Sequence, residues 1–172
     1  MKKIIATIAT LLALSMAFVG CNTHAGDDTN GSKPDPAPEA PAVTPIECDM
    51  TAEKWGWGYN SSVENDADGN LVITLKGGYG AGSFGYDPAK DLTGYTKMVV
   101  EIVSVTGADP WYQVIVQTDN DHSVKKDAKG TDANTLEVDL TSGTLDLTNV
   151  TQVSIQGKTK GDVIVVKSVT LK

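Results

Sequence analysis

A strict alternation of side chains over residues 111–117 constrains the fold more than any other stretch of the chain. Successive side chains of a strand point to opposite faces, so this stretch predicts a strand with two different faces. The core-like face holds Tyr112, Val114 and Val116. The opposite face holds Trp111, Gln113, Ile115 and Gln117. An indole beside two amides is unusual for a face that meets only water, and we expect this face to bind a ligand.

Composition excludes some classes of protein and favours one fold class. The chain has 172 residues, 14 lysines, 22 acidic residues and a net charge of −8. No basic stripe interleaved with aromatic residues is present, which argues against nucleic acid as a partner. Helix signals are scarce after the N-terminal segment, whereas valine, threonine and glycine are abundant. We therefore expect an all-β domain, and we expect it to be a monomer.

The first 46 residues predict export and attachment to a membrane. Lys2 and Lys3 precede an apolar run over residues 4–19, which is typical of a signal peptide and short for a membrane span. The sequence Phe18-Val19-Gly20-Cys21 resembles the lipobox of bacterial lipoproteins, which implies lipidation of Cys21. We expect a signal peptide (1–20), a proline-rich tether (21–46) and a folded domain (47–172). A surface or outer-membrane location follows from this interpretation.

Two aromatic segments come before the strand predicted over residues 111–117. Residues 55–59, WGWGY, predict a strand with its three rings on one side, either packed on neighbours or exposed as platforms, with Trp57 the exposed member. In the glycine-rich segment 77–86, Tyr79 and Tyr86 either line a cleft or cap the core. Between the two segments, Asp66–Asn70 predicts a hairpin turn before the core positions of a strand over residues 71–75.

The C-terminal half adds a second polar row. Gln152, Ser154 and Gln156 share a strand face opposite Val153 and Ile155, which repeats the amide pattern of the opening strand. We expect both strands to line one polar face, and Glu101 and Lys97 to join it. Residues 119–134, with His122, predict a polar loop. Residues 163–171 predict a buried strand interrupted by Lys167, and Cys48 is expected in the core.

The order of these pieces resembles a known family. An aromatic strand, a glycine-rich loop, DLTGYTKMVVEI, the aromatic-amide strand, NVTQVSIQGK and a final VIVVKSVTLK are similar to a carbohydrate-binding module of the galactose-binding-like superfamily. The resemblance covers most of residues 50–172 and implies a β-sandwich jelly roll of two antiparallel sheets. It also implies a structural calcium ion held through an acidic residue on the last strand, where this chain has Lys167.

Non-catalytic binding of a neutral, β-glucan-like polysaccharide is the leading hypothesis. A sugar offers hydroxyl groups at its edge and C–H groups on its faces, which suit amides and aromatic rings respectively. Trp111 would stack on a sugar ring, and Trp57 and Tyr79 would extend the subsites. The polar contacts would come from Gln113, Gln117, Gln152, Gln156 and Glu101.

Two other functions compete with this hypothesis. A glycoside hydrolase needs two facing carboxyl groups, and only Glu101 is expected to reach the polar face. A structural or adhesive envelope lipoprotein would use the amide face for a protein partner. The environment of Trp111 discriminates: exposure in a groove favours glycan binding, and burial between sheets removes the main anchor.

Overall fold

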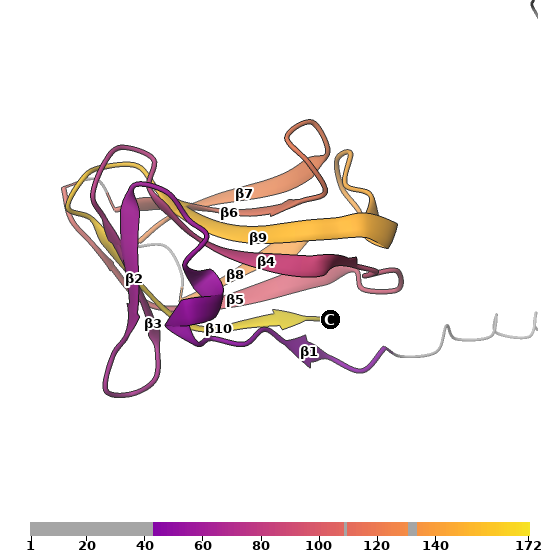
Figure 1. Cartoon of the computed structure of the whole chain (residues 1–172), viewed down its shortest axis with the longest axis horizontal. Helices are drawn as coiled ribbons and strands as arrows, with labels where there is room; N and C mark the ends of the chain where they lie inside the picture. The colour runs from indigo at the N-terminus through magenta and orange to yellow at the C-terminus, as the bar shows by residue number, and fades with distance from the viewer. Residues whose placement is uncertain (1–42, 109, 131–133) are drawn as a thin grey trace, which may run out of the picture. The chain divides into compact units, whose positions relative to one another are not determined.

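The computed structural model describes residues 43–108, 110–130 and 134–172. In this part of the chain ten strands and two short 3₁₀ helices follow one another (Figure 1). The first half of the order is β1 (Ile46–Glu47), η1 (Ala52–Trp55), β2 (Ser61–Asn65), β3 (Leu71–Leu75), β4 (Ala81–Lys90) and β5 (Lys97–Thr106). The second half is β6 (Trp111–Gln117), β7 (Ser123–Lys129), β8 (Thr135–Asp139), η2 (Leu147–Asn149), β9 (Val150–Gly157) and β10 (Val163–Leu171).

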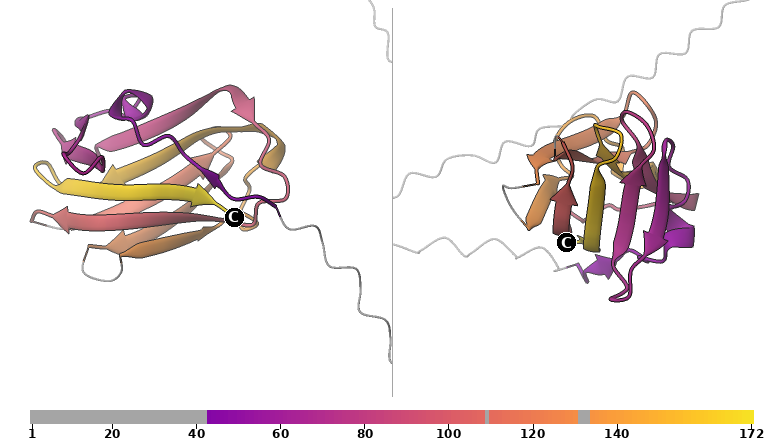
Figure 2. Two further views of the ribbon diagram at one scale, coloured as in Figure 1. Left: turned by 90° about the horizontal axis from the view of Figure 1, so that it is seen from below. Right: turned by 90° about the vertical axis from the view of Figure 1, so that its left-hand side faces the viewer.

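These strands form two antiparallel sheets that pack face to face. One sheet has the order β2-β3-β10-β5-β8, with β1 paired to the end of β10. The other sheet has the order β4-β9-β6-β7 and lies over β5, β8 and β10 in Figure 1. Figure 2 shows β1 beside the C-terminal end of β10. The predicted all-β sandwich is confirmed.

The core lies between the sheets and uses the predicted alternation. Tyr112, Val114 and Val116 of β6 are fully buried, as are Val153 and Ile155 of β9. Residues at the expected positions 71, 73 and 75 of β3 and most apolar residues of β10 fill the facing side. The compact unit that clusters around this core spans Ala40–Lys172. It contains every strand described, so residues 40–172 are the natural fragment for experiments.

Cys48 is buried in this core, as expected, with an exposed fraction of 8 %. Its Sγ lies 3.8 Å from the hydroxyl of Tyr86, which is half-buried and packs against the core. Burial raises the pKa of the Cys48 thiol because the thiolate would lose its hydration. Cys48 is therefore a neutral core residue.

Two expectations about local structure are wrong. The segment 55–59 is no strand, because η1 ends at Trp55 and turns that indole into the core, while Trp57 and Tyr59 point outward. The polar stretch 119–134 is not one loop, because β7 occupies Ser123–Lys129 within it. This edge strand has only one buried residue, Val124, so its sequence lacks the apolar alternation that would have revealed it.

The expectations for the N-terminal region lie outside the described residues. They comprise the signal peptide at 1–20, lipidation of Cys21 and nearly all of the tether over 21–46. Among the residues that the structure describes, no helix is long and apolar enough to cross a membrane.

Candidate functional site: the outer face of the four-stranded sheet

The outward residues of β4, β9 and β6 stand in register across the four-stranded sheet. In the middle row, Ser83, Ser154 and Ile115 lie side by side. The flanking rows are Ala81–Gln156–Gln113 and Gly85–Gln152–Gln117. The two predicted amide strands therefore share one face, because β9 and β6 are hydrogen-bonded neighbours whose registers bring amide opposite amide.

The β4 edge of this face is covered by two aromatic rings from the segment after η1. The main chain at Gly56 pairs in parallel with Ser83, and the Tyr59 carbonyl accepts a hydrogen bond of 3.0 Å from the amide of Ala81. A Cβ on Gly85 would lie 3.4 Å from the indole of Trp57, which places this ring over the glycine. Small residues on β4 thus make room for rings.

Trp57 and Tyr59 are both exposed although they are held against the sheet. Their exposed fractions are 73 % and 56 %, so each ring presents much of its surface to solvent. The Tyr59 hydroxyl accepts a hydrogen bond of 2.6 Å from Nε2 of Gln156. This bond ties the aromatic edge to the amide floor, and Tyr59 is a site residue that sequence analysis did not single out as a binder.

A second aromatic pair, Tyr79 and Trp111, lies at the N-terminal end of β6. Tyr79 and Trp111 meet edge to face, with ring centroids 6.5 Å apart. Tyr79 has a left-handed backbone (φ 56°), and its carbonyl accepts a hydrogen bond of 3.2 Å from Nε2 of Gln156. Trp111 is half-buried on the outer face. Trp111 is therefore neither enclosed between the sheets nor part of the cleft described below, and its expected role in stacking on a sugar stays a prediction.

The amides of the floor are already oriented by one another. Gln152 donates from Nε2 to Oγ of Ser154 at 2.8 Å, and its Oε1 lies 3.5 Å from Nε2 of Gln117. Ser154 in turn is hydrogen-bonded at 2.8 Å to Ser83, and both serines are buried. Gln113 donates to Asp127 on β7. Gln117, Gln152, Ser154 and Ser83 thus form one chain of hydrogen bonds, while Gln113 and Gln156 are oriented by separate partners.

A cleft of about 350 Å³ lies on this face between the aromatic edge and the floor. It is lined by Trp57, Tyr59, Ala81, Ile115, Gln117, Asn120, Gln152, Ser154 and Gln156. None of these nine residues is charged at neutral pH. Two rings, an isoleucine and five polar side chains can offer stacking surface and hydrogen bonds to an uncharged ligand.

Asn120 reaches the cleft from the short turn between β6 and β7. Oδ1 of Asp119 accepts hydrogen bonds of 2.9 Å from the amides of Asp121 and His122, and its carboxylate contacts Nδ1 of His122 at 2.9 Å. The hydrogen bond to Asp119, and then its charge, raise the pKa of His122. The same hydrogen bond lowers the pKa of Asp119. These contacts close the turn and fix Asn120.

The placement expected for Glu101 and Lys97 is wrong. Both lie on β5, which belongs to the six-stranded sheet, and they point to the outer face of that sheet. Glu101 forms an ion pair of 2.9 Å with Lys167, and Lys97 pairs with Glu137 at 3.1 Å. Their strand phase is correct, but the phase of one strand does not say which sheet that strand joins.

The described residues do not fit the calcium ion that the resemblance implies. Lys167 on the last strand carries a positive charge and pairs with Glu101, where a calcium site would need a carboxylate. Within residues 43–108, 110–130 and 134–172, no three side chains of the His, Cys, Asp or Glu type converge.

Comparison with known proteins shows a similar fold in solved structures but does not show which family the chain belongs to. No protein-family model matches the chain, and no curated protein matches it. Solved structures of family 29 carbohydrate-binding modules do resemble it. A mutant of the CBM29-2 module has a TM-score of 0.58 at 15 % identity, covering 76 % of this chain and 92 % of that one.

Two further CBM29-2 mutants were solved with sugars. The one complexed with cellulohexaose has a TM-score of 0.55 at 15 % identity, covering 75 % of this chain and 92 % of its own. The one complexed with mannohexaose has a TM-score of 0.56 at 15 % identity, covering 74 % and 90 %. At this identity the likeness shows that the two antiparallel sheets are arranged as in these modules.

Proposed function

We propose that this protein binds a neutral, β-glucan-like polysaccharide without catalysis, through the cleft on the outer face of the four-stranded sheet. The observation that carries the proposal is the uncharged cleft, in which the exposed rings of Trp57 and Tyr59 stand beside an ordered amide floor. Rings stack on the C–H faces of sugars, and amides both donate to and accept from hydroxyl groups.

Two further observations support this proposal. The sheet arrangement is that of modules solved with cellulohexaose and with mannohexaose. Hydrolysis of a glycosidic bond by the common mechanisms needs a pair of carboxyl groups about 5–10 Å apart, and the nine lining residues supply none. A role in holding a polymer is therefore favoured over a role in cutting it.

We further propose that the domain is a monomer held at the surface of a bacterial outer membrane. Lipidation of Cys21 would anchor the chain, and the proline-rich tether would extend the domain away from the lipid. This location would give the cleft access to a polymer too large to enter the cell. Fractionation of cells that express the wild type and Cys21→Ala would test the anchor, because only the wild type should stay with the membranes.

Affinity electrophoresis of residues 40–172 tests the binding proposal. Gels would carry soluble β-glucan, xyloglucan, mannan or xylan, and one gel would carry a uronate-bearing xylan because Lys125 stands beside Ile115 on β7. We expect retardation by a neutral β-linked polymer. Trp57→Ala should weaken binding about thirtyfold, since truncation of a central aromatic costs on the order of 2 kcal/mol.

Matched controls separate loss of binding from loss of folding. Val103→Ala removes an exposed apolar side chain from the six-stranded sheet and should leave retardation unchanged. Trp111→Ala and Gln113→Ala test the far end of the face. Absence of retardation on every polymer would contradict the proposal and leave a protein partner as the alternative, and preference for the uronate-bearing polymer would contradict a neutral ligand.

A further inference from the structure

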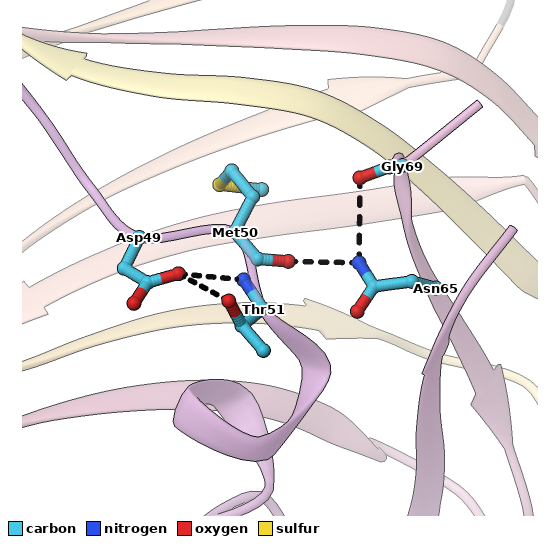
Figure 3. A pocket seen from close by; sticks show the side chains of 5 residues that line it. All are labelled: Asp49, Met50, Thr51, Asn65 and Gly69. Carbon is cyan, nitrogen blue, oxygen red and sulfur yellow. Dashed lines mark hydrogen bonds between the residues drawn. The ribbon is translucent and has the colours of Figure 1, made fainter.

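Asn65, the last residue of β2, connects two segments that lie apart in the sequence. Its Nδ2 donates to the carbonyl of Met50 at 2.9 Å, ahead of η1. The same nitrogen lies 3.3 Å from the carbonyl of Gly69 and 3.4 Å from that of Asn70, on the β2–β3 turn. Figure 3 shows this amide between Met50 and Gly69.

The orientation of this amide is fixed by its other end. Oδ1 of Asn65 accepts a hydrogen bond of 2.8 Å from the main-chain amide of Ala52, so exchanging the oxygen and the nitrogen would break that bond and set oxygen against carbonyls. The two hydrogens of Nδ2 therefore face three carbonyl oxygens. One side chain meets four main-chain groups, from residues 50–52 on one side and the hairpin turn on the other.

Three main-chain carbonyls aimed at one point resemble the coordination of a hard cation. Their oxygens carry partial negative charge and repel one another unless a positive group stands between them. The carboxylate of Asp49 lines the same recess of about 340 Å³ and is held by Thr51, whose amide donates to Oδ1 of Asp49 at 2.9 Å. Hydrogen bonds from Thr51 lower the pKa of Asp49, which keeps a negative charge nearby.

We propose that the Asn65 amide takes the place of a structural cation at this junction. The partial positive charge on its two hydrogens balances the carbonyls of Met50, Gly69 and Asn70 and fastens residues 50–52 to the hairpin. The domain therefore needs no calcium to fold, in agreement with Lys167 standing on the last strand in place of an acid. A carboxylate at position 65 would place a negative charge among these three carbonyls and make the junction bind calcium.

Thermal unfolding of residues 40–172 tests the first half of this proposal. The melting temperature of the wild type should stay within about 1 °C between excess EDTA and millimolar CaCl₂, because a ligand that does not bind the folded state cannot stabilise it. A clear fall of the melting temperature in EDTA would overturn the proposal.

Asn65→Asp tests the second half. In EDTA its melting temperature should fall by about 5 °C or more, because a carboxylate replaces a donor beside three carbonyls. Millimolar CaCl₂ should restore most of the loss, and MgCl₂ less, since magnesium demands a tighter octahedral site. Calcium binding by calorimetry gives an independent readout at a temperature where the variant is folded.

Two variants keep the result interpretable. Asn65→Ala should lose a similar amount of stability with or without calcium, because it adds no charge. Asn60→Asp changes an asparagine whose Nδ2 has one carbonyl partner, Gly78 at 3.4 Å, and should not respond to calcium. If Asn65→Asp failed to respond to calcium, or if Asn60→Asp responded equally, the carbonyl arrangement at Asn65 would have no special affinity for cations and the proposal would be wrong.

Discussion

At the scale of single residues, the proposed binding face depends on where side chains are missing. Gly85 leaves space on β4 that the ring of Trp57 covers, and Tyr59 is held nearby by its bond to Gln156. Gly58 lets the main chain pass so close to β4 that a Cβ there would lie 1.6 Å from the carbonyl oxygen of Ala81. The sequence indicated that Trp57 is exposed, but its packing over Gly85 of β4 is a long-range contact that the sequence did not predict.

Gly58→Ala should therefore damage the face more than its small size suggests. The added methyl group would push residues 57–59 away from β4, since the atoms that it meets belong to the main chain and cannot rotate aside. We expect a loss of stability of about 1–3 kcal/mol, measured by urea unfolding, together with weaker retardation by polysaccharide.

Gly56→Ala is the matched control two residues away. A Cβ at Gly56 would meet nothing closer than 3.6 Å, and the backbone there has an ordinary φ of −71°. This variant should match the wild type in stability and binding. Equal effects of the two substitutions would show that the close approach at Gly58 does not position the rings.

At the scale of elements, alternation revealed the two strands that supply the amides, β6 and β9, but not their neighbour β7. β6 and β9 each have a buried apolar face opposite an amide face, and that periodicity was visible in the sequence. β7 lies at the sheet edge with charged residues on both sides, so only its hydrogen bonds to β6 define it. The turn that joins β6 to β7 carries Asn120 into the cleft and is closed by Asp119 and His122.

This turn should show a measurable pH dependence. His122 has a pKa above its ordinary value of 6.5, so its contribution to stability is complete below pH 6.5 and is lost as pH rises through the folded-state pKa. Asp119 has a pKa below 3.8, so its contribution is present above that pH and is lost as pH falls through the lowered value.

NMR titration of the His122 imidazole measures this directly. Asp119→Asn removes the hydrogen-bonding carboxylate, which is the largest cause of the raised pKa, and should bring the pKa of His122 back towards 6.5. Lys90→Gln, which changes a charge on β4 that does not contribute to this shift, should leave the titration unchanged. An unaltered His122 pKa in Asp119→Asn would contradict the assigned contact.

At the scale of the whole molecule, the two sheets have outer faces of different character. Rings and amides lie over β4, β9 and β6 of the four-stranded sheet, with Lys125 and Asp127 beside them on the edge strand β7, whereas on the six-stranded sheet Lys97 and Lys167 are each paired with a glutamate. Exposed ion pairs of this kind contribute little to stability. The contrast between the proposed binding face and the face with the ion pairs depends on which strands share a sheet, not on any one strand.

Glu101→Gln tests this contrast. The substitution breaks the ion pair with Lys167 on the six-stranded sheet, so retardation by a bound polysaccharide should equal that of the wild type. Gln117→Ala removes an amide side chain that lines the cleft and should weaken retardation in the same gels. A loss of binding in Glu101→Gln would place the ligand on the other sheet and contradict the site described above.

The sequence by itself determined the class of the fold and named four of the nine residues that line the cleft, which are Trp57, Gln117, Gln152 and Gln156. Alternation assigns each residue to a face of its strand, because side chains of a strand have a period of two, and it correctly placed Trp111, Gln113, Gln117, Gln152 and Gln156 on polar faces. Only the tertiary structure decided which strands are neighbours. Strand order sent Glu101 to the opposite sheet, the 3₁₀ helix η1 turned Trp55 into the core, and packing brought Tyr59 to Gln156, 97 residues away. Pairing between distant segments depends on the packing energy of the whole chain, which local periodicity does not contain.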